Sequence, residues 1–418
     1  MGTPRGGADP VAGAPAKAAA LTDITRREWQ IGIVGTFDVE NYGDLLFPLI
    51  AEAELRQRLG SVKLHPFSYH AKTTPAWPYA VTSVADLPAI IDQLDGLLIG
   101  GGFLIRFDKF VAENYGPPSH DIHHPTGYWL TPALMALARG IPVAWNAPGM
   151  HCNDVPAWAE PLLRMALAES AYISVRDEPS KAVLSRYVEP GRIAVMHDTA
   201  FGITKLLPAA ESEGMQRMRK LARLWKPYIV VQPVRWADDG FPRFLERNAA
   251  RFAEYHLLGL PMGPVLGDHP RFFGKALPRF TQLPFWPDPL LLAEIISQAS
   301  GVIGYSYHLA ITAVAAGVPV FTSVDLAAGK FTALARFDTV RRLASLPESG
   351  ADVFFSRLGK TAPEPAAAAA LQQLAGHWDR IAAAIEQGRT AAPLSFNRFW
   401  QTLPALLERA ATGGKRRD

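Results

Sequence analysis

A histidine that follows a short apolar run is the first candidate for chemistry. His308 closes the segment GYSYH and precedes a run of small residues. Because an imidazole changes charge near neutral pH, a histidine at such a point could serve as a general acid and base. A lone histidine is more often a structural residue, and its position alone favours that alternative. Lys330, 22 residues further on, could bring a cation to the same place, although most lysines are simply solvated.

An arginine stands where another apolar run ends. Arg176 directly follows Tyr172–Val175 in the segment YISVRDEPS. Its guanidinium offers forked N–H donors that match the oxygens of a phosphate or a carboxylate. A structural ion pair with Asp177 or Glu178 explains the same residues equally well, so both interpretations stay open.

Two glycine-containing segments could bring backbone close to a ligand. In GTFDVENYGD, which precedes a predicted helix, Asn41, Gly43 and Asp44 could hold a polar ligand at the helix N-terminus. A turn capped by an aspartate is the simpler explanation. The segment matches neither G-x-G-x-x-G nor the P-loop pattern, so both nucleotide fingerprints fail. In LIGGGFLI, the residues Gly101 and Gly102 allow close approach of a ligand, or form a tight turn.

Other reactive residue types lack a partner set. The loop His120–His124 is rich in metal-ligand residues, but it is bounded by prolines and has no helical ligand spacing. We therefore expect no metal site, and the role of this loop stays open. The single cysteine, Cys152, has no activating context, and no G-x-S-x-G segment stands between a strand and a helix.

Alternating strands and helices must position these residues. Short apolar runs predict strands at 30–35, 96–99, 143–145, 172–175, 193–195, 228–232, 258–262, 301–304 and 318–322. Apolar residues at helical spacing, or good capping residues, predict helices from about 46 and from about 177, and at 85–94, 131–139, 158–168, 241–256, 289–299, 309–316, 366–387 and 396–411. The pattern lapses at about 202–226, which we interpret as an interdomain region.

This alternation predicts an α/β protein with two Rossmann-like domains that face a cleft. In such sheets ligands bind beyond the carboxyl ends of the strands, which is where the candidate residues fall. We expect a disordered leader (1–28), an N-terminal α/β domain (29–205) and a C-terminal α/β domain (206–345). C-terminal helices and a basic tail (346–418) follow them.

Composition narrows the function classes. A chain of 418 residues accommodates two or three domains at ~150 residues each. With 42 basic against 39 acidic residues, it lacks the basic excess of a nucleic-acid binder. One cysteine fits a reducing compartment, so we expect a cytoplasmic protein. No stretch approaches the ~18 apolar residues of a membrane span. The tail TGGKRRD is most simply a solvated end, with contact to a membrane surface as the alternative.

Taken together, these segments resemble the polysaccharide pyruvyl transferase family. The resemblance covers about 31–335, and its markers are GTFDVENYGDLL, DGLLIGGG, YISVRDEPS, HDTAF, LPMGPVLGDHP and VIGYSYHLAITAVAAGVPV. It implies a two-domain, glycosyltransferase-B-like (GT-B-like) fold. It also implies that the enolpyruvyl unit of phosphoenolpyruvate is transferred to two hydroxyls of a sugar, which forms a cyclic ketal and releases phosphate.

The resemblance assigns roles to particular positions. The reactive histidine of the family falls on His308, and its cationic helpers fall on Arg176 and Lys330. Many relatives carry an arginine two residues before the histidine, whereas this chain has a serine, as another branch of the family does. Arg235 could supply the missing charge. The expected substrate-binding residues are Asn41, Gly43, Asp44, Gly101, Gly102, Arg235, Ser306 and Tyr307.

The same resemblance implies the partners. Phosphoenolpyruvate is the donor substrate, and no cofactor, metal or nucleic acid is expected. The acceptor would be a sugar of a polysaccharide or of its lipid- or nucleotide-linked precursor, bound on the N-terminal domain, with the donor on the C-terminal domain. A lipid-linked acceptor would bring the enzyme to the inner face of the cytoplasmic membrane.

Two other functions fit the same pattern. A nucleotide-sugar glycosyltransferase of this architecture needs an acidic ribose-binding residue, and Glu294 is the nearby carboxylate that could provide it. A glycan-binding module without catalysis is the third hypothesis, and it predicts sugar binding with no release of phosphate. The acceptor sugar, the hydroxyl pair, the ketal stereochemistry and the oligomeric state stay open.

Overall fold

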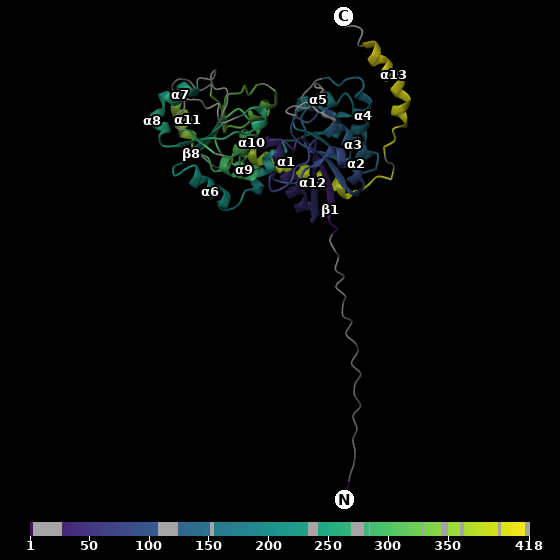
Figure 1. The fold of residues 1–418 in the computed structure, drawn as a ribbon, viewed down its shortest axis with the longest axis horizontal. Helices are drawn as coiled ribbons and strands as arrows, with labels where there is room; N and C mark the ends of the chain where they lie inside the picture. Colours follow the sequence, from purple (N-terminus) through teal and green to yellow (C-terminus); the bar gives the residue numbers. More distant parts are fainter. Residues whose placement is uncertain are drawn as a thin grey trace.

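The fold is described from a computed structural model (Figure 1). The structure describes residues 1–2, 27–107, 124–150, 154–232, 241–268, 280–283, 285–327, 329–343, 350–359, 363–391 and 394–413. Two parallel sheets, each flanked by helices, lie side by side, with the cleft that holds the candidate residues where they meet.

The first sheet is parallel and has the strand order β3-β2-β1-β4-β5. Its strands are β1 (Trp29–Val34), β2 (Val62–Ser68), β3 (Thr82–Ser83), β4 (Gly96–Ile99) and β5 (Val143–Trp145). Ile33 of β1 lies opposite Leu98 of β4, and both side chains are fully buried, as expected of a central parallel strand. A bridge from Ala144 to Tyr172 extends this layer to the parallel pair β6 (Ile173–Val175) and β7 (Ile193–Val195).

The helices of this half are α1 (Tyr42–Leu59), α2 (Leu87–Ile90), α3 (Leu130–Leu137), α4 (Glu160–Glu169) and α5 (Glu178–Leu184). The helical segment predicted at 85–94 is confirmed in outline, but it is not one continuous helix. The chain instead forms a 3₁₀ turn at Val84–Asp86, the short α2, and a second 3₁₀ turn at Ile91–Gln93. Pro88 lacks an N–H and cannot extend a helical hydrogen-bond ladder from the preceding turn, so the segment breaks up.

The second sheet is also parallel, with the order β10-β9-β8-β11-β12-β13. Its strands are β8 (Tyr228–Val231), β9 (His256–Gly259), β10 (Phe280–Gln282), β11 (Gly301–Gly304), β12 (Val320–Thr322) and β13 (Val340–Arg342). Every residue of β8 and β11 is buried, which explains their continuous apolar sequences.

The helices of the second half differ from the predicted pattern at two places. They are α6 (Glu213–Leu221), α7 (Phe241–Arg247), α8 (Ala249–Phe252), α9 (Pro289–Ser297), α10 (Tyr307–Ala315) and α11 (Ala351–Arg357). The interval 202–226 does not lack structure: a 3₁₀ segment, η5 (Thr199–Leu206), runs into it, and α6 follows. Helix α6 buries only Met215 and Met218, so its apolar periodicity is sparse. The helix predicted at 241–256 stops at Phe252, because His256 already begins β9.

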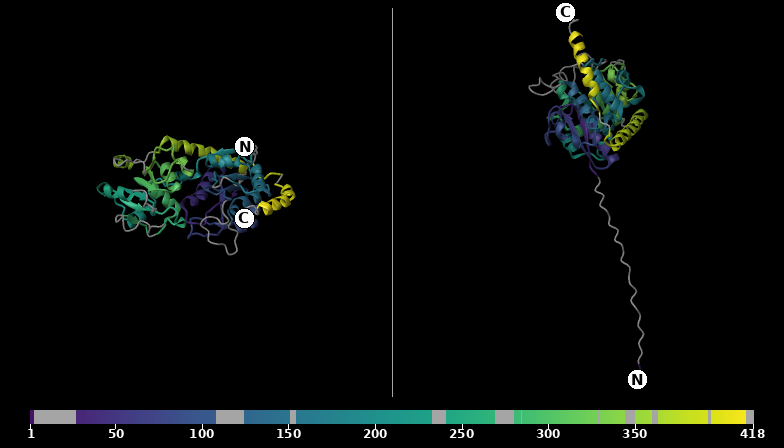
Figure 2. Two further views of the ribbon diagram at one scale, coloured as in Figure 1. Left: turned by 90° about the horizontal axis from the view of Figure 1, so that it is seen from above. Right: turned by 90° about the vertical axis from the view of Figure 1, so that its right-hand side faces the viewer.

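The predicted C-terminal helices are α12 (Pro365–Glu386) and α13 (Asn397–Gly413). Helix α12 contacts α1 and β5 of the first half as well as α10 of the second (Figure 2). His377 and Trp378 are both fully buried in this contact. The chain therefore crosses back after the second sheet, and α12 holds the two halves together. Within the described ranges, no helix has both the length and the apolar content to cross a bilayer.

The buried His377 predicts a loss of stability in acid. Its Nε2 lies 3.1 Å from Asn146 Oδ1, and its Nδ1 lies 3.0 Å from the Tyr172 hydroxyl. Burial, with Arg380 and Arg58 nearby, lowers the pKa of His377 from 6.5 to about 3. Below pH 6.5 the unfolded chain therefore binds a proton at this residue, whereas the folded chain does not. The free energy of unfolding falls as the pH drops from about 6.5 towards 3.

We expect the thermal midpoint of the wild type to fall over this window, with this group contributing up to about 1.4 kcal/mol per pH unit. The variant His377→Gln should begin at a lower midpoint and lose less on acidification, since it has no such proton to take up. Calorimetric scans from pH 7 to pH 4 measure both slopes. Parallel pH curves for the two proteins would contradict this role of His377.

Candidate active site

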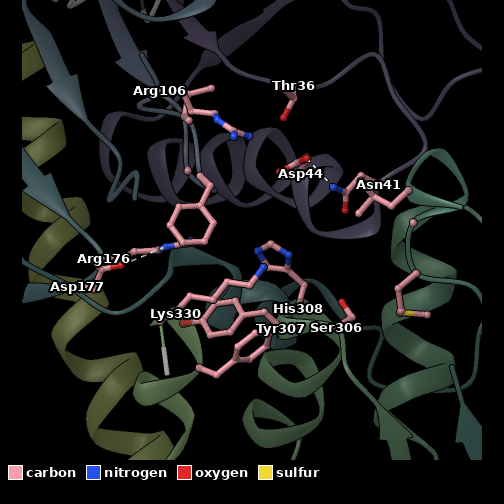
Figure 3. Close-up of a pocket in the computed structure, with 18 of the residues that line it drawn as sticks. Thr36, Asn41, Asp44, Arg106, Arg176, Asp177, Ser306, Tyr307, His308 and Lys330 are labelled. Carbon is pink, nitrogen blue, oxygen red and sulfur yellow. Dashed lines mark hydrogen bonds and ion pairs between the residues drawn. The ribbon is translucent and has the colours of Figure 1, made fainter. Parts of the chain in front are cut away.

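A cavity of about 700 Å³ opens where the two sheets meet (Figure 3). Thr36, Gln232 and Tyr305 stand directly beyond the carboxyl ends of β1, β8 and β11 and line it, so it lies where parallel α/β sheets bind ligands. The cavity brings together most of the site residues predicted from the sequence, namely Asn41, Asp44, Gly101, Arg176, Ser306, Tyr307, His308 and Lys330.

The first turn of α1 packs against the first turn of α10. Tyr42 N donates to Met262 O at 2.8 Å, and the Tyr42 hydroxyl lies 2.8 Å from Thr312 Oγ1. Gly43 lies directly against the imidazole of His308, where an added Cβ would be 1.7 Å from Nδ1. Gly43 was predicted to bind substrate, but it does not line the cavity; the absence of a side chain there makes room for the imidazole of His308.

A buried carboxylate links the histidine to the arginine. Asp198 Oδ2 accepts from Arg176 Nη1 at 3.2 Å and lies 3.7 Å from His308 Nε2. Asp198 follows β7 and caps η5, since its Oδ1 accepts from Ala200 N at 3.0 Å. Burial raises the pKa of Asp198, but His308 and Arg176 beside it lower it further, to about 2. The carboxylate is therefore ionised at neutral pH and faces both candidate residues.

Arg176 is held rigidly, yet two of its nitrogens stay unbonded. The residue is 5% exposed, and its guanidinium stacks 3.9 Å from the ring of Phe103. Its Nε and Nη2 make no hydrogen bond, although Nε lies 3.7 Å from Asp177 Oδ2. Buried N–H groups without partners are costly, and a bound anion would satisfy them. The predicted ion pair with Asp177 is therefore present, beside a closer one with Asp198, and the binding of an anion by the two unbonded nitrogens stays a prediction.

Lys330 stands beside Arg176 around the same aromatic ring. Its Nζ lies 5.4 Å from the ring centre of Phe103 and 5.8 Å from that of Tyr307. Two cations, Arg176 and Lys330, therefore line one wall of the cavity, with Asp177 beside the arginine (Figure 3). Phe103 is a residue that the sequence analysis did not single out, because a phenylalanine after a glycine run carries no chemical signal by itself.

The opposite end of the cavity carries Asp44 and Asn41 from the start of α1. Asn41 Nδ2 donates to Asp44 Oδ2 at 2.8 Å. Burial raises the pKa of Asp44, while His308, a hydrogen bond from Thr36, Lys330 and Arg176 act in the opposite direction. Gly102, at φ +80°, lies where an added Cβ would be 3.0 Å from Asp44 Oδ1. This end therefore offers amide, hydroxyl and carboxyl groups, which suit the hydroxyls of a sugar, and the guanidinium of Arg106 lies at the same end (Figure 3).

A second buried network shapes the turn before His308. Gln232 Oε1 accepts from Tyr305 N at 3.1 Å and Ser306 N at 2.8 Å. Its Nε2 donates to Asp268 Oδ2 at 2.7 Å, and Asp268 is 2% exposed. Ser306 Oγ then caps α10 by accepting from Leu309 N at 3.4 Å. The serine therefore has a structural task. Asp268 stands in the marker LPMGPVLGDHP, but its bond to Gln232 could not be recognised from local sequence.

Several candidates lie elsewhere. Arg235, Cys152 and the histidines at 120 and 123 fall outside the described residues. Glu294 is buried on α9 and accepts from Ser212 N at 2.9 Å, so it does not line the cavity, and its suggested ribose-binding role is wrong. In the described part of the chain, no group of three or more His, Cys, Asp or Glu side chains could hold a metal ion.

Comparison with known families identifies one match. The model of the family "Polysaccharide pyruvyl transferase" matches residues 41–324, more than half of the chain. The matched span includes Asn41, Arg176, Asp198 and His308, whereas Lys330 follows its end. A comparison with curated proteins gives no match.

Solved structures share the fold with little sequence identity. UDP-GlcNAc 2-epimerase from Neisseria meningitidis, bound to UDP-GlcNAc, aligns with a TM-score of 0.55 and 12% identity, over 82% of this chain and 99% of that one. Another UDP-N-acetylglucosamine 2-epimerase aligns with a TM-score of 0.51 and 10% identity, over 85% and 97% of the two chains. These likenesses concern the fold alone, and they confirm the predicted two-domain, GT-B-like architecture.

Gly43→Ala is expected to disable the site while the protein stays folded. The new methyl group would overlap the imidazole of His308, so either the ring or the contact of α1 with α10 must shift. A displacement of about 1 Å at reacting groups costs on the order of 100-fold in turnover. Steady-state kinetics measures this loss. The matched control is Gly376→Ala in α12, where nothing lies within 4 Å of the added Cβ. Equal activity of the two variants would contradict the role of Gly43.

Asp198→Asn is expected to lower kcat by at least about 100-fold, because His308 loses the carboxylate that orients its imidazole. Asparagine retains the size and the cap on Ala200 N, but the buried guanidinium of Arg176 loses its carboxylate partner, so the thermal midpoint should fall as well. Kinetics and thermal melts separate the two effects. The control is Asp288→Asn, which changes an exposed cap of α9. A variant that loses only stability would show Asp198 to be purely structural.

Proposed function

Because the chain belongs to the polysaccharide pyruvyl transferase family, we propose that it transfers the pyruvyl unit of phosphoenolpyruvate to two hydroxyls of one sugar. The product is a pyruvate ketal, and phosphate is released. The family match confirms the family and the transferase class predicted from the motifs. The donor, the ketal and the roles of individual residues belong to the proposal.

The observation that carries the proposal is the paired cationic wall beside a histidine. Phosphoenolpyruvate bears a phosphate and a carboxylate, and both need donors in a cavity that excludes much of the water. Arg176 offers two buried, unbonded nitrogens, and Lys330 adds a second cation near the same Phe103 ring. We assign these two residues to the anionic groups of the donor.

His308 is the proposed acid and base. In ketal formation each sugar hydroxyl loses a proton as its oxygen bonds to carbon 2 of the donor. One proton ends on the methylene carbon, which becomes a methyl group, and the other leaves with the phosphate as the bond from carbon 2 to its bridging oxygen breaks. With Nε2 directed at Asp198, the nitrogen Nδ1 beside Gly43 is the one we assign to these transfers.

The acceptor is proposed to bind at the Asp44 end. Asn41, Thr36 and Asp44 line that end and provide directional donors and acceptors for adjacent hydroxyls. A sugar of a polysaccharide, or of its lipid- or nucleotide-linked precursor, fits this arrangement. The epimerase of the same fold is bound to UDP-GlcNAc, which makes a nucleotide-linked acceptor worth testing. We propose no cofactor besides the donor, and a cytoplasmic setting, which a single cysteine fits.

Donor binding tests the proposal directly. Calorimetric titration with phosphoenolpyruvate should give saturable binding that weakens at least about tenfold in Arg176→Ala and in Lys330→Ala, since a charge-assisted hydrogen bond contributes ~1.5–3 kcal/mol. His308→Ala should retain donor binding and release no phosphate in the presence of acceptor. The matched control is Lys63→Ala, a change of an exposed lysine in β2 that should bind like the wild type.

The opposite outcome is equally informative. If a uridine diphosphate sugar binds and phosphoenolpyruvate does not, the nucleotide-sugar glycosyltransferase becomes the better description. If sugar binds without any release of phosphate in the wild type, the chain is a glycan-binding module. Normal phosphate release by His308→Ala would remove the histidine from the mechanism while leaving the donor assignment intact.

A further inference from the structure

Helix α13 has an apolar face that the rest of the protein leaves largely uncovered. At 100° per residue, Phe399, Trp400, Leu403, Leu406 and Leu407 fall within an arc of about 120° on one side of Asn397–Gly413. Pro404, Gln401 and Glu408 fall on the other side. This pattern is that of an amphipathic helix with a narrow apolar stripe.

The side chains of the apolar stripe stay largely exposed in the described structure. Trp400 is 59% exposed and Leu407 is 61% exposed, and Phe399, Leu403 and Leu406 are only half-buried. Among the described elements, none makes an extensive contact with α13. The rings of Phe399 and Trp400 lie 5.0 Å apart and form an aromatic surface cluster. Figures 1 and 2 show α13 along the outer side of the first half, away from the second sheet.

The helix is nevertheless tethered at its start. Leu394 N donates to Leu137 O at 3.0 Å, at the end of α3. Leu394 and Phe396 both pack against the core of the first half. The segment before α13 is therefore fixed, and the apolar stripe begins where the fixed part ends.

The charge of this part of the sequence indicates what the stripe contacts. Residues 397–418 carry two acidic residues, Glu408 and Asp418, against five basic ones, Arg398, Arg409, Lys415, Arg416 and Arg417. An amphipathic helix with aromatic and leucine residues on one face and a net positive charge suits an interface with anionic lipid.

A second copy of the chain fits this stripe less well. A helix of 17 residues is about 26 Å long, and a stripe about 10 Å wide then offers roughly 260 Å² on each copy. Two such stripes bury roughly 500 Å², well under the ~1,200 Å² of a stable interface. A lipid surface needs one helix face only, so this limit does not apply to it.

We propose that α13 binds the surface of an anionic membrane, with Trp400 and Leu407 inserted at the level of the headgroups. The helix lies in the plane of the interface and does not span the bilayer. This inference goes beyond the transferase reaction and does not depend on the identity of the donor. It provides a physical reason for such an enzyme to meet a lipid-linked acceptor at a membrane surface.

Sedimentation of the full chain with vesicles tests the proposal. The wild type should sediment with vesicles that contain phosphatidylglycerol, bind phosphatidylcholine vesicles more weakly, and lose affinity as salt rises. The double variant Trp400→Glu with Leu407→Glu should bind the anionic vesicles at least about tenfold more weakly, because it places charge on the inserted face.

The matched control replaces two other exposed apolar residues, at the end of α6 and beyond it. Leu221 is 62% exposed and Trp225 is 72% exposed, so Leu221→Glu with Trp225→Glu should sediment like the wild type. Both double variants should bind phosphoenolpyruvate as the wild type does, which shows that the cleft is intact. If the wild type binds no phosphoenolpyruvate, the transferase proposal fails while the vesicle comparison keeps its meaning.

Three results would overturn the proposal: no sedimentation of the wild type with anionic vesicles, equal loss in both double variants, or equal binding by all three proteins. Sedimentation velocity without lipid adds a separate check. A dimer that dissociates in Trp400→Glu with Leu407→Glu, together with absent vesicle binding, would assign the stripe to a second copy of the chain.

Discussion

The close approach of α1 and α10 at Gly43 is the constraint on which the site depends. His308 and Lys330 come from the second half of the chain, whereas Asp198 and Arg176 come from the first, so no single sheet contains the complete set. The contact exists because residue 43 has no side chain in the place that the imidazole occupies. Because α12 contacts α1 and α10 together, it supports the same arrangement from outside the cleft. The geometry of the proposed proton transfer is thus a property of the interface between the halves.

Much of the fold could be predicted, because parallel sheets make a strong sequence signal. Strands that are buried on both faces appear as continuous apolar runs, and the predicted bounds of β4, β5, β7 and β11 match the structure. Strand β2 could not be found in this way, since VKLHPFS mixes a charge, a histidine and a proline with its apolar residues. Helix α6 escaped for a similar reason, as only two methionines of its face are buried.

For the site, some residues could be predicted from the sequence and others could not. Residues with a strong chemical identity at strand ends, such as His308 and Arg176, could be singled out, and the cavity contains both. Their supporting partners could not. Asp198 is 110 residues from His308. Asp268 binds the side chain of Gln232, which in turn holds the turn that precedes His308. Asp198 and Asp268 stand in the markers HDTAF and LPMGPVLGDHP, but their contacts could not be inferred from these segments, because they form only when distant strand ends meet. For Glu294 the prediction failed in the opposite direction. Its nearness to His308 in the sequence suggested a site residue, but in the fold its carboxylate accepts from Ser212 N.

The charges of the wall explain why its arginine and lysine are not interchangeable. Asp198 and Asp177 both lie within 4 Å of Arg176, so its positive charge is largely neutralised before any ligand arrives. What Arg176 retains is direction, in the form of two buried N–H donors fixed by stacking on Phe103. Lys330 carries its charge on a flexible four-carbon side chain, and its ammonium does not fix the direction of its N–H donors as a guanidinium does. An anion with two separate acidic groups uses both properties, since one group needs aligned donors and the other needs a counter-charge.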